Sequence, residues 1–310
     1  MLEDKNNPLI CDIETGLCNT EENHTESHLQ HTALPEENPL KLIYYTDPIC
    51  SSCWGIEPQL RKLKLTYGHG IEIDYRMGGL LPNWSYNSGG ISKPSDVASH
   101  WDEVSLHYDM PINGDLWLED PLSSSFPPSV AFKAAQIQDK NKAILFLRRL
   151  REMVFLKKMN ITKWSHLHDA AENAGLNVDQ LKTDFESNTA NNLFQEDLKL
   201  GSQLGVRGFP TVFFINNNQV ETAVYGARPY ANYEAAILKL NPNIKAKEYS
   251  RSWEALFHIY PTLTAKEYAI LSGISRQESE PFLNALVASN QLKTFDTKNG
   301  SIWYLPNVAF

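Results

Sequence analysis

Two cysteines separated by two serines, Cys50-Ser51-Ser52-Cys53, form the motif of this sequence that most directly predicts chemistry. Two intervening residues let one helical turn bring both sulfurs together, and the unpaired N–H groups at a helix start favour a thiolate on the first cysteine. Cys50 is therefore predicted to be the nucleophile in thiol-disulfide exchange, and Cys53 the thiol that resolves the mixed disulfide. Half of a zinc site is the less favoured alternative, because no second C-x-x-C exists in the sequence.

A second motif lies far along the chain, where Gly205-Val-Arg-Gly-Phe-Pro-Thr211 places a proline directly before a β-branched run. A cis Pro210 at this point would press Phe209 against the sulfur pair and leave the backbone of Phe209 free to bind an extended substrate. An ordinary trans proline at the first position of a strand is the alternative. We therefore predict Pro210 as part of the catalytic site and Phe209 as substrate-binding.

Two residues close to the second cysteine are further candidates. Trp54 is predicted to line a substrate groove, with core packing as the alternative. Glu57 lies one helical turn beyond Cys53, so its carboxylate could accept the proton of Cys53, and an exposed helix glutamate is an equal alternative.

The surrounding pattern predicts the elements that position these motifs. An apolar, β-branched strand, Lys41–Thr46, leads into a helix from about Cys50 to Tyr67, and a second strand, Ile71–Met77, follows. From about residue 79 to 205 only helical patterns and loops occur, and the candidate helices are 127–139, 140–158, 162–174, 178–186 and 189–204. Strands at 211–215 and 219–225, joined by Asn216-Asn-Asn218, precede a last helix at 229–240. The helix at 140–158 carries Arg148, Arg149 and Arg151, which we interpret as a solvated face.

The C-terminal residues 252–310 have separate start and stop signals. Thr264-Ala-Lys-Glu267 and Ser275-Arg-Gln-Glu278 have capping-box spacing, and Gly273 lies between the two helices that they begin. Two short strands then flank Asn299-Gly300, which is a strong hairpin signal. This order predicts a small winged-helix-like α+β module. Six basic and six acidic residues follow Lys245, so no nucleic-acid partner is expected.

Residues 1–39 are predicted to form an acidic, flexible tail. The chain has a formal net charge of −9, and nine carboxylates before Leu40 face a single lysine, Lys5. The tail also carries a cluster of metal-binding side chains, which are Cys11, Cys18, His24, His28 and His31. This cluster predicts either a zinc site, a reversible disulfide between the two cysteines, or a tail without a ligand.

The composition also sets expectations about location. The start of the chain is polar and acidic, and no stretch approaches the roughly 18 apolar residues of a membrane span. We therefore expect a cytoplasmic protein that does not contact a membrane. All four cysteines lie within the first 53 residues, where they cannot cross-link a fold of 310 residues, so reactivity is the better interpretation.

Taken together, these motifs resemble a known family. Asp47-Pro-Ile-Cys-Ser-Ser-Cys-Trp54, the Gly-Phe-Pro-Thr loop and the helical stretch between strands are similar to the DsbA-like branch of thioredoxin-fold oxidoreductases, over about residues 40 to 240. Within that branch, Glu57-Pro58 and Gly78-Gly79-Leu80 add a resemblance to the cytoplasmic bacterial adaptors that deliver the regulator Spx to the ClpXP protease. The resemblance implies an α/β thioredoxin fold with a helical insertion at about residues 79–205.

Two functions follow from the resemblance and the motifs. The first is a thiol-disulfide oxidoreductase that acts on protein substrates and requires no dissociable cofactor. The second is a non-enzymatic adaptor that binds a client protein for a protease and uses its thiols to sense redox state. The resemblance also implies a tail that binds zinc, as proposed for the adaptor.

Overall fold

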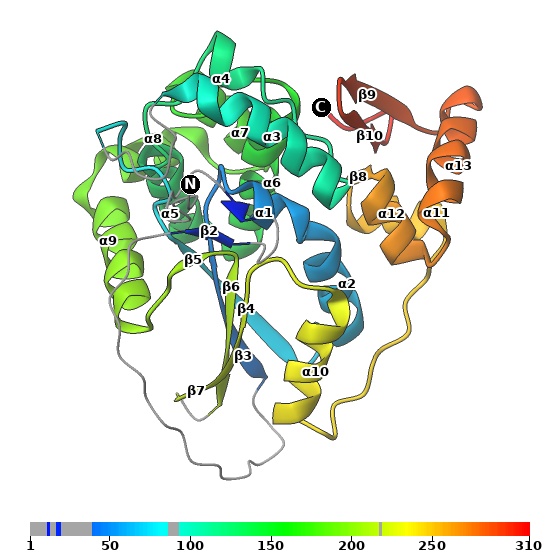
Figure 1. The fold of residues 1–310 in the computed structure, drawn as a ribbon, viewed down its shortest axis with the longest axis horizontal. Coiled ribbons are helices and arrows are strands. Elements are labelled where there is room, and N and C mark those ends of the chain that lie inside the picture. The colour runs from blue at the N-terminus through cyan, green and yellow to red at the C-terminus, as the bar shows by residue number, and fades with distance from the viewer. Residues whose placement is uncertain (1–10, 13–16, 20–38, 86–92, 217–218) are drawn as a thin grey trace, which may run out of the picture.

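The computed structural model describes residues 11–12, 17–19, 39–85, 93–216 and 219–310. Its centre is a four-stranded sheet in the order β4-β3-β6-β7 (Figure 1). β3 (Leu40–Thr46) pairs in parallel with β4 (Ile71–Met77), while β6 (Thr211–Asn216) is antiparallel to both β3 and β7 (Gln219–Tyr225). β3 is almost entirely buried, as its continuous apolar run predicts for a central strand.

Two helices separate β3 from β4 where the sequence predicted one. α1 (Ser51–Gly55) has Ile56 as its C-cap, and α2 (Glu57–Tyr67) begins directly after Ile56. Pro58 lies in the first turn of α2, where it has no N–H group with which to continue the hydrogen bonds of α1. α10 (Tyr230–Leu240) contacts α2, and in Figure 1 these two helices lie on the side of the sheet opposite α5 and α9.

The long stretch between β4 and β6 is helical, as predicted. The five expected helices are present with small shifts at their ends, as α5 (Phe126–Gln138), α6 (Lys140–Leu156), α7 (Trp164–Asn173), α8 (Val178–Glu186) and α9 (Asn188–Gln203). α3 (Pro94–Tyr108) and the short α4 (Leu116–Glu119) were not predicted. Val97, Trp101 and Val104 of α3 are buried at alternating spacings of four and three, and this periodicity was a usable signal.

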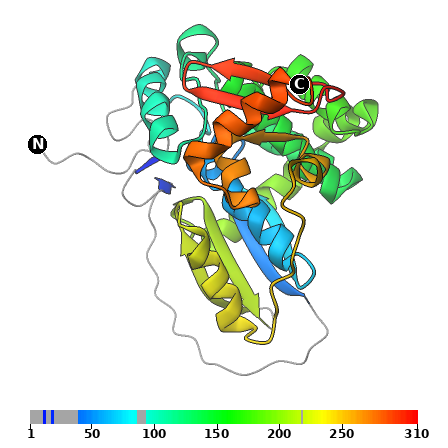
Figure 2. The ribbon, with the colours of Figure 1, turned by 90° about the vertical axis from the view of Figure 1, so that its right-hand side faces the viewer.

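The C-terminal residues form a compact group of helices and strands. α11 (Trp253–Ile259), α12 (Ala265–Ser272) and α13 (Arg276–Ala288) pack with a three-stranded sheet, β8-β10-β9, made of Thr262–Thr264, Gly300–Tyr304 and Lys293–Thr297. Both predicted capping boxes are present, and Gly273 has a φ of 84°. Assignment to the winged-helix class stays a prediction. Figure 2 shows these elements in orange and red against the helical insertion, and α12 contacts α2.

Part of the predicted flexible tail is ordered against the rest of the chain. β1 (Cys11–Asp12) pairs with β2 (Leu17–Asn19), and β2 pairs with the two-residue strand β5 (Gly208–Phe209). A short edge strand elsewhere in the fold supplies these residues with backbone partners. The flexible tail at residues 1–39 stays a prediction. Apart from Pro39, the remaining residues of the predicted tail lie outside the described ones, as do residues 217–218 of the predicted turn.

Among the helices of the described residues, none is both long and apolar enough to cross a bilayer.

Candidate functional site

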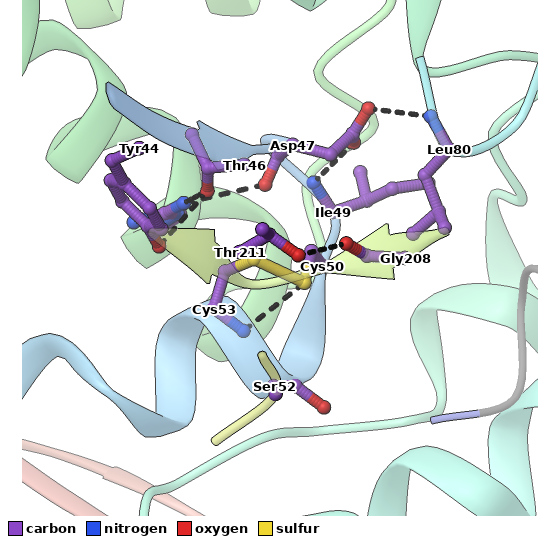
Figure 3. The surroundings of a disulfide bond; sticks show 12 residues. Tyr44, Thr46, Asp47, Ile49, Cys50, Ser52, Cys53, Leu80, Gly208 and Thr211 are labelled. Atoms are coloured by element: carbon purple, nitrogen blue, oxygen red, sulfur yellow. Dashed lines mark hydrogen bonds between the residues drawn. A yellow bond between two sulfur atoms is a disulfide. The ribbon is translucent and has the colours of Figure 1, made fainter. Parts of the chain in front are cut away.

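The two cysteines of the C-x-x-C motif form a disulfide at the start of α1 (Figure 3). Cys50 is the N-cap residue of α1, its Cα lies 5.2 Å from that of Cys53, and its sulfur accepts a hydrogen bond from the Cys53 backbone N–H at 3.1 Å. A sulfur at this position receives a helix N–H and the positive end of the helix dipole. The helix-start position predicted for Cys50 is confirmed, and its role as nucleophile stays a prediction. Both cysteines are fully buried.

The Gly-Phe-Pro loop lies next to the disulfide (Figure 3). The Phe209–Pro210 peptide bond is cis, as predicted. Thr211 Oγ1 donates a hydrogen bond to the Gly208 carbonyl at 2.8 Å, which fixes the loop on both sides of the proline. A Cβ atom on Gly78 would overlap the Phe209 ring, so the close approach of these two residues requires glycine at position 78.

The backbone of Phe209 is not left open to a substrate. Cys18 is the antiparallel partner of Phe209, and Asn19 is the partner of Gly208. The position at which an extended peptide would add a strand is therefore taken by residues 17–19 of the same chain. This corrects the expectation of an exposed Phe209 backbone, while the substrate-binding role of Phe209 stays a prediction.

A buried aspartate holds the loop that leads into Cys50. Asp47 Oδ1 accepts a hydrogen bond from the Ile49 N–H at 3.0 Å, and Oδ2 accepts hydrogen bonds from the Leu80 N–H at 2.8 Å and from Ser125 Oγ at 2.9 Å. Burial raises the pKa of Asp47 to about 6, although these hydrogen bonds oppose the shift. Sequence reasoning did not assign this residue to the site. The Asp-Pro pair directly before the C-x-x-C was the available signal.

Trp54 belongs to the core and does not line a groove. Its side chain is fully buried, stacks on Phe155 with ring centroids 5.6 Å apart, and donates from Nε1 to the Pro111 carbonyl at 3.1 Å. The guanidinium of Arg148 lies over its ring at 4.3 Å. The prediction of a substrate-binding Trp54 was therefore wrong, because Phe155 and Arg148 of α6, a helix remote in sequence, cover the ring.

Glu57 lies within a cluster of arginines. It accepts a hydrogen bond from Arg151 and forms ion pairs with Arg61 at 3.7 Å and Arg148 at 4.0 Å. Burial alone would raise the pKa of Glu57, but the charges of Arg151, Arg148 and Arg61 outweigh it and hold the pKa below its ordinary value. A carboxylate with a lowered pKa is a poor proton acceptor, so these contacts favour a structural role. Proton transfer from Cys53 to Glu57 stays a prediction.

The basic cluster on α6 is buried rather than solvated. Arg148 is 7% exposed and Arg151 is 0% exposed, and Arg148 binds Glu152 at 2.8 Å and Glu267 at 2.9 Å. Arg151 also donates to Thr46 Oγ1 and to the Asp47 carbonyl, at the end of β3 that leads into the site. The sequence prediction was wrong because it treated α6 as having one covered face, while α2 and the C-terminal elements cover a second.

The predicted metal cluster cannot be assembled from the described residues. Cys11 and Cys18 are directly opposed in the register of β1 and β2, whereas His24, His28 and His31 lie outside the described residues. Within the part of the chain that the structure describes, no three His, Cys, Asp or Glu residues gather in a way that could hold a metal. Zinc in this segment stays a prediction, as does the disulfide between the two cysteines.

Comparison with known proteins places these features in context. The thioredoxin family model matches residues 44–235. The chain is 32% identical over 302 residues to the ClpXP adapter protein SpxH of Halalkalibacterium halodurans, covering 96% of this chain and 97% of the relative. It is 27% identical over 282 residues to the protein of the same name from Bacillus subtilis, covering 90% of this chain and 93% of the relative.

Solved structures agree on the fold. The cytosolic disulfide reductase DsbM from Pseudomonas aeruginosa aligns with a TM-score of 0.53 at 20% identity, covering 65% of this chain and 100% of the reductase. At this identity the likeness shows a DsbA-like thioredoxin fold. The α/β fold predicted for residues 40–240 is thereby confirmed as a class.

Proposed function

Because this chain belongs to the thioredoxin family and, within it, to the family of the SpxH relatives, we propose that it is an adapter that binds a client protein and presents it to a ClpXP-type protease. The observation that carries this proposal is the extent of the match. The H. halodurans relative named as a ClpXP adapter aligns along 96% of this chain, whereas the DsbM alignment covers 65% of it. A cytoplasmic location is part of the proposal.

The structure offers a physical basis for client binding. The C-terminal elements are joined to the thioredoxin-like part by buried ion pairs, of which Arg148 with Glu267 and Arg61 with Glu267 are the shortest, at 2.9 and 3.2 Å. Buried ion pairs of this kind hold two groups of elements in one relative orientation. A rigid pair of surfaces suits a protein that must hold a client in one pose for a second partner.

A degradation assay tests the adapter function. Purified full-length chain is added to ClpXP and Spx, and the loss of Spx is followed with time. We expect the rate of Spx degradation to rise with the concentration of the chain and then to saturate. A rate that stays at its starting value, together with no binding of Spx in titration calorimetry, would overturn the proposal.

The matched control separates binding from thiol chemistry. The variant Cys50→Ala with Cys53→Ala removes both sulfurs of the site but no large side chain. An adapter that works by docking keeps its stimulation of Spx degradation in this variant. Complete loss of stimulation by a variant that still folds would instead favour the catalytic function described next.

A second function, thiol-disulfide exchange, is supported by the local geometry. Cys50 is at the N-terminus of α1, where its sulfur accepts a helix N–H, and the cis Phe209–Pro210 loop lies beside the disulfide. In this function the Cys50 thiolate attacks a substrate disulfide, and Cys53 resolves the resulting mixed disulfide. No dissociable cofactor and no nucleic acid take part in either function.

Trapping tests the exchange function. With glutathione disulfide as the probe, Cys53→Ser should accumulate a glutathione adduct on Cys50, whereas Cys50→Ser should accumulate far less on Cys53. Mass spectrometry of the intact protein and its peptides measures both. Equal labelling of the two single variants would contradict the assigned order of nucleophile and resolving thiol.

A further inference from the structure

The strand position beside the cis proline is filled by a strand that carries a cysteine. β2 (Leu17–Asn19) is antiparallel to β5, and Cys18 is the residue opposite Phe209. Extended peptides bind sheet edges by adding a strand in this manner, with the main chain supplying affinity. Residues 17–19 therefore occupy this chain's own binding edge as an extended substrate would.

The same strand lies close to the helix that carries the disulfide. β2 contacts both β5, which belongs to the Gly-Phe-Pro loop, and α1, whose N-cap is Cys50 (Figure 1). The topology thus brings Cys18 to the edge where a substrate cysteine would have to lie in order to react with Cys50.

A second cysteine lies in the same row of paired residues. Cys11 is opposite Cys18 in the β1–β2 pair, so Cys11, Cys18 and Phe209 form one line across the three-stranded sheet β1-β2-β5. Directly opposed residues of antiparallel strands have Cβ atoms about 4.5–5.5 Å apart, near the range that a disulfide needs.

We propose that the paired strands β1 and β2 are an internal substrate of the Cys50–Cys53 site. In this proposal the pairs Cys11–Cys18 and Cys50–Cys53 exchange one disulfide through a bond between Cys18 and Cys50. The proposal rests on the exchange function proposed above and adds its first substrate. β2 occupies the position beside β5 that an extended client would take.

The exchange balances without an external oxidant. The Cys18 thiolate attacks the sulfur of Cys50, the Cys50–Cys53 bond breaks, and Cys53 leaves as a thiolate. The Cys11 thiolate then attacks the sulfur of Cys18, which forms Cys11–Cys18 and releases the Cys50 thiolate. Two electrons pass from the thiols of Cys11 and Cys18 to the site, and the two protons that they lose are taken up through solvent by Cys50 and Cys53.

The test uses full-length variants that retain only two cysteines. In Cys11→Ser with Cys53→Ser, only Cys18 and Cys50 remain, and low micromolar protein is oxidised with glutathione disulfide. We expect a Cys18–Cys50 linked peptide in most molecules, at a rate independent of protein concentration, because a tethered partner has a high effective concentration. Peptide mass spectrometry without reduction measures it.

Two controls distinguish positioning from simple tethering. Cys18→Ser with Cys53→Ser retains Cys11, which is one strand further from Phe209. We expect Cys11 to cross-link to Cys50 at least about tenfold more slowly than Cys18 does, which corresponds to about 1.4 kcal/mol. Asn19→Pro in the first variant removes a backbone N–H from β2 and should slow the Cys18 cross-link as well. Equal rates in all three variants would overturn the proposal.

The remaining outcomes separate this proposal from the exchange function. Glutathione bound to Cys50 without any Cys18–Cys50 bond would overturn the internal substrate while the exchange function stands. Neither adduct nor cross-link, in a variant whose circular dichroism matches the parent protein, would overturn both.

Discussion

Arg148 on α6 and Glu267 in the first turn of α12 form a bidentate ion pair, with Nη1–Oε1 and Nη2–Oε2 distances of 2.9 and 3.0 Å. Both side chains are buried. Glu267 also accepts a hydrogen bond from the Thr264 N–H at 2.8 Å, so one carboxylate caps α12 and binds the arginine. This pair joins the C-terminal elements to the helix that also reaches the end of β3 through Arg151.

Removal of the Glu267 charge should therefore destabilise the whole protein. Glu267→Gln leaves Arg148 and Arg61 buried with less negative charge to balance them, and we expect a loss of about 3–5 kcal/mol in the free energy of unfolding. Urea denaturation followed by circular dichroism measures it. The control, Glu254→Gln, changes an exposed glutamate of α11 and should alter stability by less than about 0.5 kcal/mol. Similar losses in both variants would contradict the assignment.

Arg151 should be irreplaceable by lysine. Its guanidinium donates to Glu57, to Thr46 Oγ1 and to the Asp47 carbonyl, and a single ammonium group cannot reach all three. We expect Arg151→Lys to cost about 2 kcal/mol of stability, the contribution of one or two hydrogen bonds to a charged group. Arg149→Lys, on the same helix with a single ion pair to Glu152, should cost much less. Thermal unfolding of both variants would show a reversed order if the prediction is wrong.

The free energy of unfolding should depend on pH through the protonation of Asp47. Burial raises its pKa from 3.8 to about 6, so the native protein holds this proton more tightly than the unfolded chain does. Its contribution to stability is complete below about pH 4 and is lost as the pH rises through 6, and it amounts to roughly 3 kcal/mol.

Asp47→Asn should remove that part of the pH dependence. Urea unfolding at several pH values between 4 and 7 gives the slope of the free energy of unfolding against pH, and this slope is compared between variant and parent. Asp169→Asn, which changes an exposed aspartate, should keep the parent slope. An unchanged slope in Asp47→Asn would show that another group titrates in this range.

A methyl group at position 78 should displace the cis-proline loop. The added Cβ of Gly78→Ala would overlap the Phe209 ring, and overpacking of this kind costs about 1–3 kcal/mol. We expect weaker client binding and slower reaction of Cys50 with glutathione disulfide. Gly205→Ala has positive φ but open space around the added atom, so it should cost stability and leave Cys50 reactivity intact. Loss of reactivity in both variants would count against a specific role for Gly78.

Much of the fold could be predicted because its signals are local. The apolar run of β3, the proline before β6 and the capping boxes at Thr264 and Ser275 depend on residues a few positions apart. The Cys50–Cys53 pair also belongs to this class, since one helical turn sets the distance between the two residues. α3 escaped prediction although Val97, Trp101 and Val104 have helical spacing.

The assignments that failed depended on partners remote in sequence. Trp54 is buried because Phe155 and Arg148 cover its ring, and Glu57 is held by arginines of a helix about ninety residues away. No pattern around either residue reports such neighbours. Burial of a side chain is a property of the elements packed against it, so the sequence near Arg148 could not distinguish a solvated face from a charged interior.

By itself the sequence determined the chemistry available to this protein, namely a C-x-x-C at a helix start and a proline before a strand. Tertiary structure alone decided where that chemistry is directed. It brought the loop that carries Gly208 and Thr211 to the disulfide, placed Cys18 opposite Phe209, and connected the end of β3 to Glu267 through buried arginines. The reason is that local patterns fix backbone conformation over a few residues, whereas contacts between distant segments depend on how the whole chain buries its apolar surface.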